Sequence, residues 1–331
     1  MKDIASMRAI RIHRTGGREV LEFDSLPIPV PPPGHALVRI AAAGVNFIDV
    51  YKRTGLYKVA LPAILGEEGA GRIVSFGAGA SEPGVGRRVA WAGVMGAYAE
   101  YAVVPVERLV PVPDGVSAII AAALMLQGMT AHYLVTSTRP LAPGDSCVVH
   151  AAAGGVGLLL VQLAKRRGAR VLATAGSDAK AGLARAAGAD NVVVYTRDDF
   201  VAEAKRFTEG RGVDVIYDSV GRSTFLPGLD ALAPRGMMVL FGQSSGPVDP
   251  IDPQLLNRKG SLYLTRPTLS HYTATRDQLR ARSDELFQLV ESGGLAVRIG
   301  VELPLGAAAE AHRALEGRRT TGKVVLLPPG E

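Results

Sequence analysis

The sequence predicts a two-domain α/β protein, in which a β-rich domain accompanies a doubly wound, six-stranded parallel sheet. The chain has 331 residues, of which 47% are hydrophobic, and this is more than one ordinary core requires. Short apolar segments separated by Gly and Pro fill the first third, whereas strand and helix patterns alternate from Asp145 onward. We therefore expect the β-rich domain over residues 1–126 and 269–331, and the parallel-sheet domain over residues 127–268.

The β-rich domain begins with Met7–His13, where apolar and polar residues alternate with the period of a half-buried strand. Five prolines between Leu26 and Gly34 exclude a helix there. Further strands are expected at Ala36–Ala43, Arg72–Phe76, Arg88–Ala92 and Tyr98–Val104. Many short strands with Gly and Pro turns favour a barrel or a compact β domain.

The second domain follows an Ala- and Leu-rich helix expected over Ser117–Tyr133. Its expected strands are Ser146–His150, Arg170–Thr174, Asn191–Tyr195, Val213–Asp218, Met237–Phe241 and Ser261–Thr265. Its expected helices are Gly155–Arg167, Asp178–Ala187 and Asp199–Thr208. Because these six strands complete a doubly wound sheet, the later elements are expected to return to the first domain. They are the helices Thr275–Glu291 and Ala307–Leu315 and the strands Arg298–Pro304 and Lys323–Leu327.

Composition and charge restrict the function classes. The net charge of +6 suits an anionic ligand, but no long basic run or aromatic platform favours nucleic acid. The single cysteine, Cys147, excludes an intrachain disulfide and a cysteine-rich zinc site, and the six histidines lack metal-ligand spacing. No metal ligand and no G-x-S-x-G nucleophile is therefore expected.

No secretory signal is recognisable, and the most apolar window, Ala118–Leu126, is shorter than the ~20 residues of a membrane span. A soluble cytoplasmic protein is therefore expected. Met7 could be the natural first residue, in which case residues 1–6 are an extension.

The strongest local signal is a glycine-rich turn between an apolar strand and a helix. On the pattern G-x-G-x-x-G the three positions are Ala152, Gly154 and Gly157. Gly154 lets the backbone approach a diphosphate, and Gly157 lets the helix pack closely on the strand. The N–H groups at the helix N-terminus favour an anion there, so the turn predicts dinucleotide binding by a Rossmann fold.

The end of the next strand distinguishes the two nicotinamide cofactors. An NAD site usually has an acidic residue there, but this strand ends without one. Ser177 and Lys180 follow instead, and Tyr195 ends the third strand, so hydroxyl, ammonium and phenol groups favour the 2′-phosphate of NADPH over NADH. Asp178 fits a phosphate poorly, although it could cap the following helix.

Several further motifs together resemble one family. They include Gly44–Tyr51, Gly66–Gly71, Tyr217–Gly221, Phe241–Gly246 and Ser261–Pro267, in addition to the glycine turn. Over essentially its whole length the chain resembles the zinc-free NADPH:quinone oxidoreductases of the medium-chain dehydrogenase/reductase superfamily, which include zeta-crystallin. The resemblance implies that the β-rich domain is GroES-like and catalytic. At Glu67 the chain has a carboxylate where a metal-binding histidine would be expected.

The resemblance also implies roles for individual residues. Asn46, Tyr51 and Tyr57 are expected to line the cleft for nicotinamide and quinone and to be the catalytic residues. The expected NADPH-binding residues are Thr130, Gly154, Gly155, Val156, Ser177, Lys180, Tyr195, Phe241, Gly242, Ser244, Leu264, Arg266 and Arg318. The strand 261–265 is expected to be the edge through which two subunits form a homodimer.

The expected activity is a metal-independent transfer of reducing equivalents from NADPH to a quinone. A quinone is already electrophilic, so hydrogen-bond donors such as Asn46 or Tyr51 would suffice and no strong acid is needed. Two alternatives stay open. One is reduction of an alkenal or enone, where Tyr51 or Tyr57 would protonate carbon, and the other is a non-enzymatic crystallin or RNA-binding role.

Overall fold

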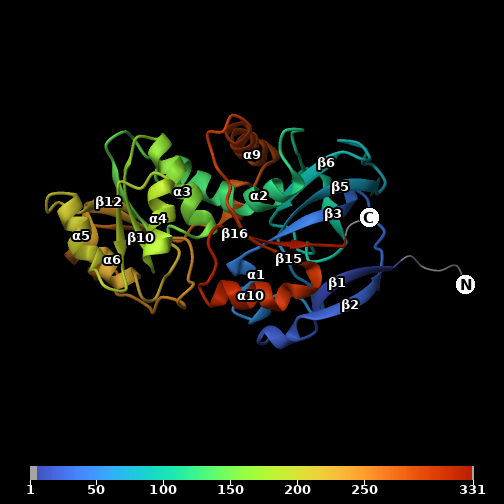
Figure 1. Ribbon diagram of the computed structural model, residues 1–331, viewed down its shortest axis with the longest axis horizontal. Helices are drawn as coiled ribbons and strands as arrows, with labels where there is room; N and C mark the ends of the chain where they lie inside the picture. Colours follow the sequence, from blue (N-terminus) through green and yellow to red (C-terminus); the bar gives the residue numbers. More distant parts are fainter. Residues whose placement is uncertain (1–5, 330–331) are drawn as a thin grey trace, which may run out of the picture. The chain divides into compact units, whose positions relative to one another are not determined.

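The computed structural model describes residues 6–329 (Figure 1). It forms two compact units, of which unit 1 runs up to Met129 and resumes at Thr273, and unit 2 covers Thr130–Tyr272. Each boundary lies within a few residues of the predicted division. Residues 1–5, most of the segment that could be an extension, lie outside the described residues.

Unit 2 is built on a six-stranded sheet with strand order β11-β10-β9-β12-β13-β14. All five neighbouring pairs are parallel, so the predicted doubly wound sheet is confirmed. The strands are β9 (Ser146–Val149), β10 (Arg170–Ala175), β11 (Asn191–Val194), β12 (Val213–Asp218), β13 (Leu232–Leu240) and β14 (Tyr263–Thr265). The chain order reverses beside β9, and this is where such sheets bind ligands at their carboxyl edge.

Helices cover both faces of this sheet, and Figure 1 shows α3 and α4 on one side of the strands and α5 and α6 on the other. The helices of unit 2 are α3 (Gly155–Arg166), α4 (Asp178–Ala186), α5 (Phe200–Phe207), α6 (Phe225–Ala231), α7 (Gln254–Arg258) and α8 (Leu269–Tyr272). The sequence did not predict α6, which contains Pro227 and Gly228. Pro227 lies in the first helical turn, where its missing N–H costs no hydrogen bond.

Unit 1 contains a seven-stranded sheet and a three-stranded sheet. The first follows the order β15-β16-β3-β5-β6-β8, with β7 paired to β3, and the second follows the order β2-β1-β4. The strands are β1 (Ser6–Ile12), β2 (Glu22–Pro27), β3 (His35–Val45), β4 (Ala63–Ile64), β5 (Glu68–Phe76), β6 (Arg88–Ala92), β7 (Tyr101–Pro105), β8 (Val110–Pro111), β15 (Ile299–Pro304) and β16 (Lys323–Leu327). As predicted, the C-terminal strands join this β-rich unit, because β16 pairs antiparallel with β3.

The helices of unit 1 are α1 (Phe47–Arg53), α9 (Arg276–Glu291) and α10 (Ala308–Glu316), with short 3₁₀ turns at Arg18–Val20, Val106–Arg108 and Leu305–Ala307. The core of the unit includes the fully buried side chains of Trp91 and Tyr98. No local pattern in the sequence predicts α1, although this helix carries Tyr51.

The chain passes from unit 1 to unit 2 within α2 (Ala118–Tyr133), which continues into a π-helical turn, Leu134–Thr138. Among the described residues, Ala118–Thr138 is the one helical stretch whose length and composition would allow it to cross a membrane. Most of its residues are buried inside the protein, as in a core helix.

Candidate active site

The glycine turn joins β9 to α3 and leaves the start of that helix uncapped. The N-cap residue, Gly154, has no side chain that could accept a hydrogen bond from the first turn, which includes Gly155 and Val156. A Cβ atom on Gly157 would lie 2.4 Å from the carbonyl oxygen of Ala151, so only glycine allows the helix to start this close to the strand. The geometry fits a diphosphate, which would accept hydrogen bonds from the first-turn N–H groups.

The residues expected to hold the 2′-phosphate gather at the carboxyl ends of β10 and β11. Ser177 is the N-cap of α4 and accepts a hydrogen bond of 3.4 Å from the backbone N–H of Lys180. Tyr195 donates its backbone N–H to the carbonyl of Ala175 over 3.1 Å. The Tyr195 hydroxyl oxygen lies 2.7 Å from where a Cβ atom on Gly176 would stand, so the phenol lies directly against this glycine.

A third segment at this end of the sheet holds Phe241, Gly242 and Ser244, which follow β13. The N–H groups of Phe241 and Gly242 donate to the carbonyl of Asp218 over 2.8 and 3.2 Å, and that of Ser244 donates to Ser219 over 3.2 Å. A Cβ atom on Gly242 would lie 2.6 Å from the Ser219 carbonyl oxygen. The segment after β13 therefore folds tightly against the segment after β12, and Gly242 is required for that contact.

Two of the three predicted catalytic residues form an aromatic pair in unit 1. The ring of Tyr51, on α1, lies 5.3 Å from the ring of Tyr57 and 6.0 Å from the ring of Phe47, measured between centroids. The backbone N–H of Tyr57 also donates to the Tyr51 carbonyl over 3.0 Å. Both tyrosines are half-buried.

Asn46, the third predicted catalytic residue, is the buried N-cap residue of α1. Its Oδ1 accepts from Lys323 Nζ at 2.8 Å and from Gln127 Nε2 at 3.0 Å. Its Nδ2 donates to Glu68 Oε2 at 2.9 Å and to the Gly44 carbonyl at 3.3 Å. Both amide hydrogens are thus used inside unit 1. A role for Asn46 as donor to a substrate oxygen stays a prediction, and it requires one of these bonds to be exchanged.

Two of these partners of Asn46, Lys323 of β16 and Glu68 of β5, form a buried ion pair with each other. The two side chains are 1% and 0% exposed. Glu68 also accepts the backbone N–H of Leu126 over 2.6 Å, so both of its carboxylate oxygens have donors. Burial lowers the pKa of Lys323, and the neighbouring Glu68 carboxylate opposes that shift. Through its bonds to Asn46, the pair connects β16 and β5 to the N-terminus of α1.

A second buried chain of hydrogen bonds runs from Asp49 of α1 to α10. The Tyr98 hydroxyl donates to Asp49 Oδ2 over 2.9 Å, and His312 Nε2 lies 3.2 Å from the Tyr98 oxygen. Arg53 Nη1 lies 3.1 Å from His312 Nδ1. Because arginine can only donate, Nδ1 must accept and the neutral imidazole carries its hydrogen on Nε2.

Burial shifts the pKa values of Asp49 and His312, which both belong to this series of hydrogen bonds. Desolvation, helped by the nearby Glu67 carboxylate, raises the pKa of Asp49 to about 7. Desolvation also lowers the pKa of His312 to about 3, with Arg53 adding to the effect. Unit 1 therefore holds a neutral histidine and a carboxyl group that titrates near neutrality.

The other predicted cofactor residues are spread over both units. Thr130 is buried in α2, Leu264 is 39% exposed in β14, and Arg266 is exposed just after that strand. Arg318 is exposed after α10 and adopts a positive φ of 54°. The first three belong to unit 2 and Arg318 belongs to unit 1, so their roles toward the cofactor stay predictions.

Comparisons with known proteins match both units. Residues 32–114 match the family described as alcohol dehydrogenase GroES-like domain, and residues 155–292 match the family described as zinc-binding dehydrogenase. The chain is 45% identical to a quinone oxidoreductase of Pseudomonas aeruginosa, over 97% of this chain and 99% of the relative. The chain belongs to the quinone oxidoreductases of the medium-chain dehydrogenase/reductase superfamily.

Two further relatives widen this comparison. The crystal structure of Escherichia coli quinone oxidoreductase complexed with NADPH is 41% identical, with a TM-score of 0.93, over 97% of this chain and all of that chain. A 2-haloacrylate reductase of Burkholderia is 38% identical over 96% of this chain and 98% of the relative. The family resemblance and the GroES-like and Rossmann architecture expected from the sequence are confirmed.

In this quinone oxidoreductase, the position expected for a zinc-binding histidine is part of an ion pair. Glu67 Oε1 accepts from Lys52 Nζ, and both side chains are largely buried. The ammonium group of Lys52 therefore already balances the carboxylate that a metal ion would need.

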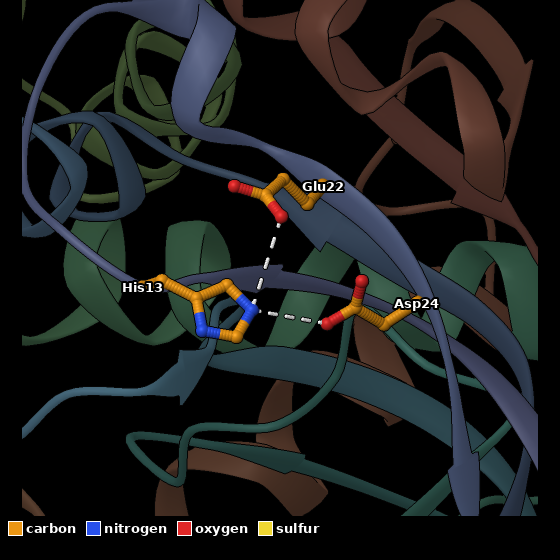
Figure 2. A group of neighbouring side chains, drawn as sticks. All are labelled: His13, Glu22 and Asp24. Atoms are coloured by element: carbon orange, nitrogen blue, oxygen red, sulfur yellow. Dashed lines mark hydrogen bonds and ion pairs between the residues drawn. The ribbon is translucent and has the colours of Figure 1, made fainter.

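Among residues 6–329, one group of histidine and acidic side chains lies close enough to share an ion, and Figure 2 shows it. His13 Nε2 lies 3.2 Å from Asp24 Oδ2 and 3.9 Å from Glu22 Oε2. Pairing of β1 with β2 brings together residues whose sequence spacing had not indicated ligands. Arg11 Nε also lies 2.8 Å from Asp24 Oδ2, and all three groups are accessible to solvent, so the cluster is not assigned as a metal site.

Sequence reasoning missed Gln127, Lys323 and Arg197. Lys323 gave a usable signal, because it is the single charge of an otherwise apolar strand, and such a charge must be paired if it is buried. Gln127 and Arg197 gave none, since an amide in a helix and an arginine in a polar turn are ordinary. Arg197 pairs with Asp178, the residue that fitted the phosphate site poorly.

Proposed function

We propose that this chain is an NADPH-dependent quinone oxidoreductase that works without a metal ion. The observation that carries the proposal is the uncapped N-terminus of α3 above Gly157, in a chain whose whole length matches quinone oxidoreductases. NADPH, when bound, supplies the hydride or the electrons from C4 of its nicotinamide. The protein's part is to hold the cofactor, orient the quinone and exclude water.

The two half-buried tyrosines of unit 1 suit the acceptor. A phenol can stack on a quinone ring and donate its O–H to the oxygen that gains negative charge. Tyr51 and Tyr57 hold each other's rings in place at 5.3 Å, so this donor is oriented before the quinone binds. With hydride as the first hydrogen, the product needs one proton, which can come from water, so this reaction does not depend on a strong general acid.

Reduction of a carbon–carbon double bond is the second candidate, because the chain is also 38% identical to a 2-haloacrylate reductase. That reaction adds hydride to one carbon and a proton to its neighbour, so a proton donor becomes essential. Tyr51 and Tyr57 are the candidate donors. The two reactions therefore differ in how strongly they depend on a phenolic proton.

The test is the rate of NADPH oxidation with small quinones, enones and 2-haloacrylates, measured for the wild type and Tyr51→Phe. Quinones are expected to be the fastest acceptors, and Tyr51→Phe should lower kcat/KM for quinone by up to ~10²-fold while NADPH affinity is unchanged. Tyr101→Phe, a half-buried tyrosine of β7, is the matched control. Rapid turnover of haloacrylate with no turnover of quinone would contradict the proposal.

The cofactor assignment has a test of its own at Lys180. Lys180→Ala should raise the NADPH dissociation constant by about tenfold to a hundredfold, because a charge-assisted contact to the 2′-phosphate is lost. NADH binding should hardly change. Direct titration of both cofactors decides this, and equal losses for NADPH and NADH would remove Lys180 from the phosphate site.

The edge of the parallel sheet supports a homodimer as part of this proposal. Among the described residues β14 pairs with β13 alone, so it is the edge strand of the six-stranded sheet. Tyr263 and Leu264 are 58% and 39% exposed on this strand, which is unusual for large apolar side chains at an uncovered edge. Light scattering should give twice the chain mass, and Tyr263→Lys with Leu264→Lys should give the monomer mass.

A further inference from the structure

The first turn of α4 carries an acidic residue, Asp178, at a position where its carboxylate would repel the 2′-phosphate of NADPH. In dinucleotide sites, an acid near the end of the second strand binds the ribose 2′-hydroxyl and disfavours a 2′-phosphate. Asp178 directly follows Ser177, the N-cap residue assigned to that phosphate. Its side chain is 69% exposed, so the carboxylate is not hidden by burial.

Arg197 binds this carboxylate in a two-pronged ion pair. Nη2 lies 2.7 Å from Asp178 Oδ1 and Nη1 lies 2.8 Å from Oδ2, so each oxygen has its own N–H donor. Hydrogen bonding to Arg197 lowers the pKa of Asp178, and the same contact raises the pKa of Arg197. The pair therefore stays ionised and together carries no net charge.

The turn after β11 fixes Arg197 beside the other residues that are assigned to the 2′-phosphate. Its backbone N–H donates to the Val194 carbonyl over 3.0 Å, at the end of β11. Its Nε lies 3.5 Å from Asp198 Oδ2. Tyr195, two residues before it, lies against Gly176 at the end of β10. The turn after β11 thus delivers both the phenol and the guanidinium to the start of α4.

We propose that Arg197 is a specificity-determining residue, which masks Asp178 so that this chain accepts the 2′-phosphate of NADPH. The inference rests on the proposed use of NADPH at this turn. With Arg197 in place, Lys180 acts on the phosphate without an opposing free carboxylate. Without it, Asp178 faces the phosphate unpaired and becomes a hydrogen-bond acceptor suited to the 2′-hydroxyl of NADH.

The experiment is a titration of NADPH and NADH, followed by fluorescence, into the full-length wild type and four variants. Arg197→Ala should raise the NADPH dissociation constant by about tenfold, because a like charge now lies near a phosphate that carries almost two. NADH binding should be unchanged or tighter. Arg197→Ala with Asp178→Ala should return the NADPH dissociation constant to within about threefold of wild type, since the acid that needed masking is gone. Asp178→Ala alone should keep the preference for NADPH.

Arg206→Ala is the matched control, because it removes the same charge from an exposed arginine near the end of α5, which pairs with Glu203 and not with Asp178. It should leave the ratio of the two dissociation constants unchanged. Repeating the titrations with adenosine 2′,5′-bisphosphate and ADP, which lack nicotinamide, should reproduce the pattern.

Three results would overturn the inference while leaving NADPH as the cofactor. They are an unchanged ratio in Arg197→Ala, a double variant that binds NADPH as poorly as Arg197→Ala, and an equal shift in Arg206→Ala. A wild type that prefers NADH would instead contradict the proposed function, so the two failures are distinguishable.

Discussion

Replacing Lys323 by methionine should destabilise unit 1 strongly, because it leaves a buried charge without its partner. Met has nearly the length of Lys but no ammonium group. Glu68 would keep two donors, the Leu126 N–H at 2.6 Å and Asn46 Nδ2 at 2.9 Å, but it would lose its only cation within this network of described residues. Breaking one side of a buried ion pair typically costs about 3–5 kcal/mol of unfolding free energy.

The assay is urea denaturation followed by the fluorescence of Trp91, the only tryptophan of the chain, which is fully buried in β6 and so reports on unit 1. A second variant, Lys323→Met with Glu68→Gln, removes both charges and should recover most of the loss. Arg280→Met breaks an exposed pair on α9 and should cost less than about 0.5 kcal/mol. The reasoning is refuted if Lys323→Met costs under about 1 kcal/mol, or if the double variant is as unstable as the single one.

Three other predictions concern pH, packing and metal. Asp49 keeps its proton up to about pH 7 in the folded unit, whereas an unfolded aspartate loses it near pH ~4, so stability should fall as pH rises between these values. Asp49→Asn should flatten that slope in Trp91-monitored denaturation, and an unaltered slope would refute the assignment. Gly157→Ala should cost about 1–3 kcal/mol and weaken NADPH binding, because its Cβ atom meets backbone, whereas Gly182→Ala in open space should be neutral or stabilising in circular-dichroism melts. Prolonged chelation should leave quinone reduction intact and elemental analysis should find less than stoichiometric zinc; loss of turnover that zinc restores would disprove metal independence.

The sequence was sufficient to predict the parallel sheet, because its signals are local. The apolar strand before Gly154, the uncapped helix after it and the regular alternation that follows each depend on neighbouring residues. The absence of an acid at the tip of β10 likewise indicated NADPH without any knowledge of distant contacts. The sequence predicts a strand only from Met237, whereas β13 begins at Leu232, because Pro234 and Gly236 resemble a turn when tertiary pairing is unknown.

The tertiary structure alone decided which polar groups meet. Lys323 and Glu68 are 255 residues apart in the chain, and only the pairing of β16 and β5 with β3 brings them together around Asn46. Arg197 and Asp178 meet because β10 and β11 end side by side. Ion pairs and hydrogen bonds depend on distances of a few ångströms between remote segments, and no local pattern encodes such a distance. Hydrophobic periodicity and glycine turns therefore determined the fold of this protein, and long-range pairing of charges decided how its site is held and tuned.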